Sequence, residues 1–233
     1  MATPTSFATM SSESVPDATA WEAAYSRFET SGQEIRKFIR RLRRMGAMSW
    51  DRNQAVVELF CGRGNGLVAL GRLGFSQVEG VDLSPSLLSQ YNGSARCYVA
   101  DCRSLPFTDD SKDVIVIQGG LHHLQTLPED FDLCLSEIHR VLRTGGKVLI
   151  VEPWLTPFLS FVHWVCGRKV ARRLFSKIDS LATMIEHEHT TYHQWLRQPA
   201  CVLRTLQRYF VPEHSVCRWG KLMFVGQKRI RTV

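Results

Sequence analysis

The stretch that decides the fold reads Glu58-Leu-Phe-Cys-Gly62-Arg-Gly64-Asn-Gly66. It carries a short apolar run, Ala55–Phe60, into a segment of helical pattern, Leu67–Leu73. Glycines at such a turn let the backbone pass close to a ligand, where a Cβ would clash. The carboxyl end of a strand beside a helix N-terminus is also where nucleotide ligands bind in open α/β sheets. The stretch therefore predicts a ligand-binding turn, although a tight structural turn also needs glycine.

Strand-like and helix-like segments alternate after this turn. Four further strands are predicted at Gln77–Val81, Ala95–Ala100, Asp113–Ile117 and Lys147–Val151. Between them, Ser84 and Pro85 begin a short helix through Gln90, and a helix over Pro128–Leu142 is closed by Gly145 and Gly146. Two more short strands are predicted at 216–219 and 222–227. This alternation implies a parallel sheet with helices on both of its faces.

The chain length indicates one domain. The 233 residues suit a single large unit, which we expect over residues 21–230. Residues 1–20 are rich in Ser, Thr, Ala and Pro, and we expect them to form a disordered tail. A helical insertion rich in Trp and Phe is expected from about residue 153 to about residue 197.

A helical cap is expected ahead of the first strand, over about residues 21–49. Apolar residues recur at helical spacing through Ser31–Met45. Ser31 and Glu34 match a capping box, and Gly46 stands where a C-terminal glycine belongs. A firm helix is therefore predicted over Ser31–Met45.

Apolar runs and cysteines bound the class of protein. No run of eighteen apolar residues occurs, so no transmembrane helix is expected. The seven cysteines are scattered and form no Cys-x-x-Cys pair. We therefore expect no disulfide partner and a reducing, cytoplasmic location.

The formal charge of +7 is unevenly placed along the chain. Residues 47–150 hold nine Lys and Arg against twelve Asp and Glu, so this segment carries −3 and the flanks carry +10. Basic flanks around a mildly acidic core suggest attraction to an anionic partner, either RNA or an anionic membrane surface. A simply solvated basic surface is the alternative.

Two carboxylates stand where the predicted second and third strands end. Asp82 follows the second strand, and a carboxylate there can accept hydrogen bonds from both hydroxyls of a ribose. Asp101 follows the third strand, where it can accept from an exocyclic adenine amine. Either residue alone is more simply a cap or turn residue. In register with Glu58 and the glycine turn, the two predict a nucleoside pocket.

Four motifs in this order resemble the core of the class I methyltransferases that use S-adenosylmethionine, nearest to the ubiquinone and menaquinone methyltransferases. The resemblance covers somewhat under half of the chain, from about Val56 to Glu152. It is carried by Val57-Glu-Leu-Phe-Cys-Gly-Arg-Gly64, Asp101-Cys-Arg-Ser-Leu-Pro-Phe107, the segment from Asp113 through Gln118-Gly-Gly-Leu-His-His-Leu124, and Glu137-Ile-His-Arg-Val-Leu-Arg-Thr-Gly-Gly146. It implies a Rossmann-like, doubly wound, mostly parallel seven-stranded sheet that ends in an antiparallel strand pair.

The resemblance also implies a cofactor, S-adenosyl-L-methionine, and the residues that hold it. Glu58 and the turn glycines would bind the methionine part, Asp82 the ribose, and Asp101 with the Cys102 backbone N–H the adenine. Gln118 and Gly119 would lie under the sulfonium. The turn glycines are Gly62, Gly64 and Gly66.

Two substitutions depart from the family pattern, and the spacing of the glycines separates this family from another. Phe60 stands where the family usually has glycine, which is expected to narrow the pocket near the methionine end, and Thr144 replaces a common proline. The glycines are not spaced Gly-x-Gly-x-x-Gly, and a carboxylate at Glu58 suits an ammonium better than a pyrophosphate. Both features argue against a dehydrogenase.

His122 and His123 follow the fourth strand, near where the reactive methyl should project. One of them is expected to act as a base or to orient the methyl acceptor, since histidine titrates near neutral pH. The alternative is that one packs and the other forms a structural hydrogen bond. His187 and His189 invite a metal reading, but a solvated helix end is preferred, and no metal site is expected.

The acceptor is expected to be a small molecule, contacted by the N-terminal cap and the insertion. The Trp- and Phe-rich stretch after Pro153 suggests an aromatic, isoprenoid or lipid-like oxygen or carbon nucleophile. Two alternatives stay open. Basic flanks also fit a tRNA or RNA methyltransferase, and a module that binds cofactor without turnover has the same pattern.

Overall fold

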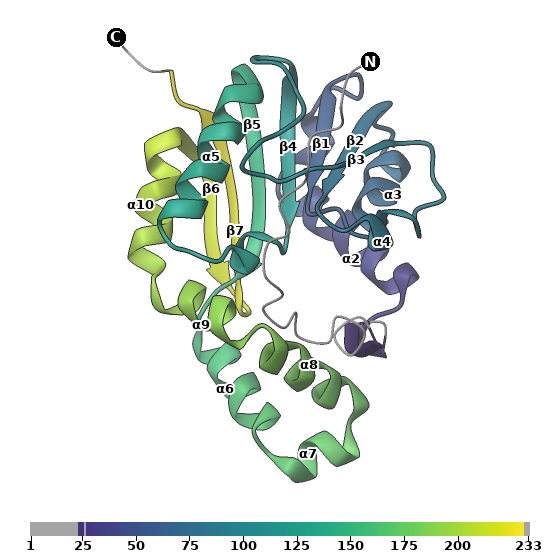
Figure 1. Cartoon of the computed structure of the whole chain (residues 1–233), viewed down its shortest axis with the longest axis vertical. Coiled ribbons are helices and arrows are strands. Elements are labelled where there is room, and N and C mark those ends of the chain that lie inside the picture. The colour runs from purple at the N-terminus through teal and green to yellow at the C-terminus, as the bar shows by residue number, and fades with distance from the viewer. Residues whose placement is uncertain (1–22, 26, 231–233) are drawn as a thin grey trace, which may run out of the picture.

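The computed structural model describes residues 23–25 and 27–230 and forms one seven-stranded sheet of order β3-β2-β1-β4-β5-β7-β6 (Figure 1). Strands β1 to β5 are parallel, and β7 runs antiparallel between β5 and β6. The strands are β1 Ala55–Leu59, β2 Gln77–Asp82, β3 Arg96–Val99, β4 Lys112–Gln118, β5 Leu142–Pro153, β6 Phe210–Arg218 and β7 Lys221–Lys228. The doubly wound sheet with an antiparallel C-terminal pair is therefore confirmed.

Helices cover both faces of the sheet and bury two apolar clusters. On one face, α2 (Ser31–Arg44) and α3 (Asn65–Arg72) enclose residues such as Leu42, Leu70 and Val116. On the other face, α5 (Glu129–Val141) and α10 (Pro199–Tyr209) enclose a larger cluster. β4 and β5 contribute to both clusters because successive side chains point to opposite faces.

Three short elements flank the strands. α4 (Pro85–Leu88) follows β2 and begins at Ser84, whose Oγ accepts from Leu87 N at 3.2 Å, as the sequence predicts. The 3₁₀ turn η1 (Ala47–Ser49) follows Gly46, which has a φ of 86°. A second 3₁₀ turn, η2 (Leu121–His123), follows β4. α4 and η2 thus lie at the carboxyl edge of the sheet, whereas η1 lies between α2 and the start of β1.

The start of α2 corrects one sequence prediction. The capping box is formed by Thr30 and Gln33, one residue earlier than the predicted pair Ser31 and Glu34. Glu34 is instead buried and turned inward, where its carboxylate accepts hydrogen bonds from Tyr25 and from Asn65 Nδ2. Because Glu34 is engaged in these contacts, the helix is capped by Thr30 and Gln33.

Several boundaries differ from the predictions. β6 begins at Phe210, six residues before the predicted 216. The sequence does not indicate the earlier start, because most side chains of β6 are exposed and give no apolar alternation. The turn between β6 and β7 is made by Trp219 and Gly220, with φ of 52° and 73°, a geometry that favours tight hairpins. The tail expected over residues 1–20 lies outside the described residues.

Helices α6 to α9 form an arm between β5 and α10, beyond the carboxyl ends of the parallel strands (Figure 1). They span Pro157–Cys166, Lys169–Leu174, Ser176–His187 and His189–Arg197. Trp195 anchors α9, since its ring is fully buried against Phe131 and its Nε1 donates to Pro153 O at 2.8 Å. Within residues 23–25 and 27–230, each helix is too short or too polar to cross a bilayer.

Leu42 tests how α2 contributes to stability. Leu42→Ala is expected to lower the free energy of unfolding by about 2–5 kcal/mol, because the side chain is fully buried against the sheet. Urea unfolding measures this loss. Leu133→Ala is the matched control, since Leu133 is also helical but 55% exposed, and the change there should stay below about 1 kcal/mol. If Leu42→Ala lowered the free energy of unfolding no more than Leu133→Ala, Leu42 would not contribute to a packed core.

Candidate cofactor and acceptor site

The glycine turn after β1 is held in a left-handed conformation. Gly62 and Gly64 have φ of 51° and 78°, and Gly64 is the N-cap residue of α3. A Cβ on Gly64 would lie 2.1 Å from Cδ2 of Tyr91. The turn therefore needs glycine both for its backbone angles and for the close approach of the tyrosine ring.

Gly66 makes room for the carboxylate of Glu58. A Cβ on Gly66 would lie 1.7 Å from Glu58 Oε1, so the first residue of the motif and its last glycine fit together. Glu58 is 3% exposed, and burial, together with the charge of Glu34, raises the pKa of its carboxyl well above the ordinary value. Burying a carboxylate without a cationic partner is unfavourable. The position therefore favours a bound positive charge.

Glu58 Oε2 and both amide atoms of Gln118 are buried without a hydrogen-bond partner that meets the usual geometric limits. Gln118 ends β4, the strand beside β1, and its amide is close enough to stabilise the charged form of Glu58. Buried polar atoms without partners are rare in folded proteins. These atoms mark a place where a polar ligand would complete the hydrogen bonding.

Asp82 links the end of β2 to the glycine turn. Its Oδ2 accepts from Gly62 N at 2.7 Å, and its Oδ1 accepts from Ser84 N at 2.8 Å. A carboxylate has about four lone-pair positions, so each oxygen can accept one more hydrogen bond. Asp82 thus has the structural role of a turn residue and still offers acceptors for ligand hydroxyls.

Asp101 lies beyond β3 but is engaged by an arginine. Arg103 donates to both carboxylate oxygens of Asp101 and to Asp130 Oδ1. These hydrogen bonds lower the pKa of Asp101 despite partial burial. Cys102 beside it is buried near Cys134. An adenine amine at Asp101 would share the carboxylate with Arg103.

The loop after β4 is open at one glycine and closed at the next. Gly119 has a φ of 91°, and a Cβ there would meet nothing within 4 Å. A Cβ on Gly120 would lie 2.1 Å from Cγ of Phe60. Phe60 itself has a φ of 57°, a conformation that costs about 1–3 kcal/mol for a bulky residue. The ring of Phe60 therefore packs on the loop after β4.

Glu152 holds this loop from the end of β5. The residue is fully buried, and its Oε1 accepts from Gly120 N and Leu121 N at 2.8 and 2.9 Å. Its Oε2 lies 2.7 Å from His122 Nδ1. Burial opposes its charge, but His122 and the two backbone N–H groups outweigh it and lower its pKa. A carboxylate only accepts, so His122 Nδ1 carries the proton of this bond.

The two histidines differ in charge. Burial opposes protonation of His122, but Glu152 and Glu188 outweigh it and raise its pKa to about 9. Burial and the neighbouring His122 lower the pKa of His123 to about 4. At neutral pH the site therefore holds one imidazolium, His122, beside one neutral imidazole, His123.

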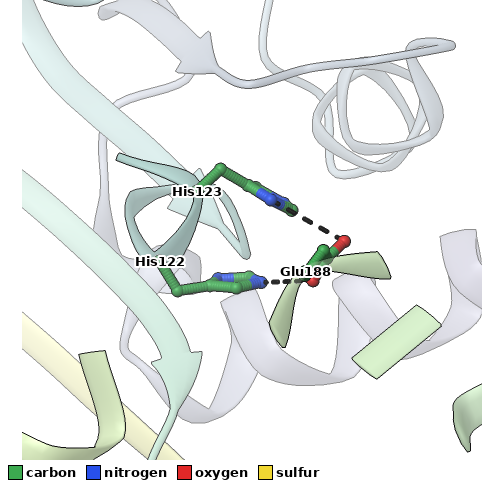
Figure 2. Close-up of side chains that lie close together, drawn as sticks. All are labelled: His122, His123 and Glu188. Atoms are coloured by element: carbon green, nitrogen blue, oxygen red, sulfur yellow. Dashed lines mark ion pairs between the residues drawn. The ribbon is translucent and has the colours of Figure 1, made fainter. Parts of the chain in front are cut away.

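Glu188, from the junction of α8 and α9, faces both rings (Figure 2). Its Oε2 lies 3.5 Å from His122 Nε2, and its Oε1 lies 3.7 Å from His123 Nδ1. Tyr192, one turn further along α9, packs edge-on against His122 at 5.8 Å and lies 3.1 Å from His163 Nε2 through its hydroxyl. The arm thus contributes directly to the site.

Sequence reasoning missed the role of Glu188. The Glu186-His187-Glu188-His189 segment reads as a solvated helix end, and His189 and Glu186 are indeed exposed. Glu188 is the member that turns inward. Nothing in its local pattern signals this, because its partners lie some sixty residues earlier in the chain.

The described residues fit the methionine part of S-adenosylmethionine better than its adenine. The unpaired atoms of Glu58 and Gln118 and the open space at Gly119 lie at the ends of the neighbouring strands β1 and β4. Asp82, at the end of β2, contacts the same turn. Asp101 is bound by Arg103 instead. The unpaired atoms of Glu58 and Gln118, together with Asp82, agree with a ligand that carries an ammonium group and hydroxyl groups.

Comparison with known proteins agrees with this geometry. Residues 57–150 match a family model described as a methyltransferase domain. A ubiquinone/menaquinone biosynthesis C-methyltransferase of Geotalea daltonii is 34% identical over 95 residues, which is 37% of this chain and 39% of that protein. The chain therefore matches well under half the length of this relative.

Two solved structures show the same fold over most of the chain. A putative S-adenosyl-L-methionine-dependent methyltransferase of Methanococcus maripaludis has a TM-score of 0.62 and 15% identity, covering 97% of this chain and all of the other. Geranyl diphosphate C-methyltransferase of Streptomyces coelicolor has a TM-score of 0.61 and 16% identity, covering 85% of this chain and 77% of the other. Residues 57–150 therefore belong to the class I S-adenosylmethionine-dependent methyltransferases, with distant relatives among the ubiquinone and menaquinone methyltransferases.

Proposed function

We propose that this chain transfers a methyl group from S-adenosyl-L-methionine to a small-molecule acceptor. The observation that carries the proposal is the buried carboxylate of Glu58, seated against Gly66 with one oxygen unpaired beside the unpaired amide of Gln118. An α-ammonium would supply the missing donors and the positive charge. The domain match over residues 57–150 supports the same cofactor.

The binding roles follow from the contacts already described. Glu58, Gln118 and the turn glycines Gly62, Gly64 and Gly66 would hold the methionine part, and Gly119 leaves space beneath the sulfonium. Asp82 would accept from the ribose hydroxyls through its remaining lone pairs. Asp101 and the Cys102 N–H would contact the adenine, with Arg103 as a further participant.

Methyl transfer is an in-line displacement. A bond forms between the acceptor atom and the methyl carbon, the carbon–sulfur bond breaks, and its electron pair stays on sulfur to give S-adenosylhomocysteine. The proton of a hydroxyl or carbon acceptor leaves to a base or to water. The protein's contribution is to align the two reactants and to exclude water.

His122 and His123 would act on the acceptor side. His122 is charged and held between two carboxylates, so it positions and polarises rather than accepts a proton. His123 is neutral at pH 7 and is the ring that can accept a proton or offer a lone pair. Glu188 and Tyr192 bring the arm against both rings, which supports the arm as the acceptor-covering insertion.

The arm also carries an exposed aromatic strip, which favours a lipid-like acceptor presented at an anionic membrane surface. Phe158 packs edge-on against Trp219 at 5.2 Å, and Phe161 stacks on Trp164 at 6.0 Å, although all four rings are largely exposed. The guanidinium of Arg168 lies 4.5 Å from the Trp164 ring centroid. Exposed Lys169, Arg173 and Lys177 follow on α7 and α8. Aromatic rings next to basic groups suit a lipid headgroup layer.

Glu58→Gln is expected to weaken binding of S-adenosylhomocysteine about ten- to a hundredfold at pH 8, because it removes a charge-assisted hydrogen bond. Isothermal titration calorimetry measures this. Affinity of the wild type should rise with pH, since the ammonium needs the carboxylate and burial keeps its pKa raised. Glu129→Gln is the control, because Glu129 is an exposed residue at the start of α5. Unchanged affinity in Glu58→Gln would remove the proposed ammonium contact.

The same variant has a stability signature without ligand. A carboxyl whose folded-state pKa is raised stabilises the fold below its ordinary pKa and loses that contribution as pH rises. The stability advantage of Glu58→Gln over wild type should therefore grow as pH increases above about 4.5. Urea unfolding at several pH values tests this, and a difference that does not depend on pH would contradict the buried, unpaired state of Glu58.

Gly66→Ala and Gly71→Ala form a matched pair on α3. The added methyl at position 66 would displace the Glu58 carboxylate, whereas at position 71 it meets nothing within 4 Å. Gly66→Ala should lose most S-adenosylhomocysteine binding, and Gly71→Ala should bind normally and gain up to about 1 kcal/mol in stability. Circular dichroism confirms folding of each. Normal binding by Gly66→Ala would place the ligand elsewhere.

Removing rings of the aromatic strip should detach the protein from anionic vesicles. The double variant Phe161→Ser with Trp164→Ser is expected to bind phosphatidylglycerol vesicles at least about tenfold more weakly than wild type in a sedimentation assay. Leu133→Ser with Val211→Ser, also exposed, is the control. Salt-sensitive binding of tRNA without any binding to vesicles would assign the basic surface to RNA instead.

A further inference from the structure

Three side chains at the acceptor side form a group with the composition of a metal site. One ring nitrogen of His122, one ring nitrogen of His123 and one carboxylate oxygen of Glu188 all lie within 4.8 Å of one another (Figure 2). His122 and His123 come from the η2 turn after β4, and Glu188 comes from the arm. Two separate parts of the chain therefore converge on one point. Among the residues that the structure describes, it is the one group of three or more His, Cys, Asp or Glu side chains that lie close enough together to hold a metal ion.

The spacing is close to that of a small divalent ion. Two atoms that each lie about 2.0–2.1 Å from a tetrahedral zinc ion are about 3.3 Å apart. The carboxylate oxygens of Glu188 lie 3.5 Å from His122 Nε2 and 3.7 Å from His123 Nδ1. The two distances are made by different oxygens of Glu188, so an ion would bind with the side chains turned until one carboxylate oxygen and the two ring nitrogens face it.

Glu152 supplies the second interaction that a metal-binding histidine usually has. Its Oε2 accepts from His122 Nδ1 at 2.7 Å, and its Oε1 is held by Gly120 N and Leu121 N. The hydrogen bond fixes the His122 ring so that Nε2 points toward Glu188. A carboxylate that orients the far nitrogen of a ligand histidine is the common arrangement around protein-bound zinc.

A purely structural ion pair between His122 and Glu188 explains less. It accounts for the contacts of Glu188 with both rings, but it gives no reason for the two ring centroids to lie 4.2 Å apart. An ion would be coordinated by both neutral rings, with His122 keeping the proton of Nδ1 toward Glu152 and losing that of Nε2 as the ion binds. Imidazole and carboxylate together suit zinc and related transition metals, with a fourth position left for another ligand.

We propose that His122, His123 and Glu188 bind a divalent transition-metal ion, with zinc as the reference ion, and that its open position takes an oxygen of the methyl acceptor. The role toward the acceptor rests on the proposed methyltransferase function. An acceptor hydroxyl bound to the ion loses its proton to water more easily, which leaves the oxygen as the nucleophile. This proposal differs from the sequence prediction of no metal site. In the metal-loaded protein, His122 and His123 would act as ligands, and the proton-accepting role proposed above for His123 would belong to the metal-free chain.

Metal binding is measured directly on the full chain after chelator treatment. Zinc titration by calorimetry and the visible spectrum of the cobalt-loaded protein should show one site per chain. Glu188→Gln and His123→Asn should each weaken zinc binding at least about a hundredfold and abolish the cobalt bands. Glu152→Gln, which removes the orienting carboxylate, should weaken binding about ten- to a hundredfold. Thermal melting shows whether each variant is folded.

Two control variants separate this site from adventitious binding. His189→Asn removes an exposed ring that lies 4.4 Å from His193, and Glu186→Gln removes an exposed carboxylate on the same segment. Both should bind zinc as tightly as the wild type. Zinc binding that survives in Glu188→Gln and His123→Asn, or that is lost in His189→Asn, would overturn the proposal.

Binding of S-adenosylhomocysteine to the metal-free chain keeps the two proposals distinguishable. Cofactor binding without any zinc binding would overturn the metal site and leave the proposed function intact. Zinc binding without any cofactor binding would support the site and overturn the methyltransferase role.

Discussion

The hydrogen bonds of Glu152 fix the loop on which the acceptor side of the site is built. This carboxylate is fully buried, and burial alone would force it to accept a proton. Three donors from one loop prevent this: the N–H groups of Gly120 and Leu121 and the Nδ1 of His122. Because β5 is an inner strand that pairs with β4 and β7, the loop after β4 is anchored to the interior of the sheet. The positions of His122 and His123 follow from this anchor.

Glu58 is a second buried carboxylate, but the protein does not supply hydrogen-bond donors to both of its oxygens. It is buried on the strand next to β4, but one of its oxygens lacks a partner, and its carboxyl is shifted toward the neutral form. A fold rarely retains an unpaired buried carboxylate unless a ligand supplies the missing charge. Glu152 therefore stabilises the fold, whereas Glu58 destabilises it unless a cation binds. The contrast separates a structural carboxylate from a binding one.

The placement of the proposed donor-side residues could be predicted from sequence because the signals are local. Glu58, the turn glycines and Asp82 fall within twenty-five residues, and the strand–turn–helix order around them fixes their edge of the sheet. The same kind of local prediction was wrong by one residue at the start of α2. There, Ser31 with Glu34 and Thr30 with Gln33 are equally good capping pairs. The choice was made by tertiary contacts, since Glu34 is used by Tyr25 and Asn65.

The acceptor side could not be predicted in this way, because its decisive residue comes from the arm. Glu188 reaches the histidines through helices that pack by way of Trp195, whose N–H is bound by Pro153 O at the end of β5. Pro153 directly follows Glu152, so the same strand end anchors both the histidine loop and the arm. A change in the packing of the arm would therefore move Glu188 relative to the rings without disturbing Glu58 or Asp82. Under the proposed function, this arrangement would let the donor half stay constant while the insertion determines the acceptor.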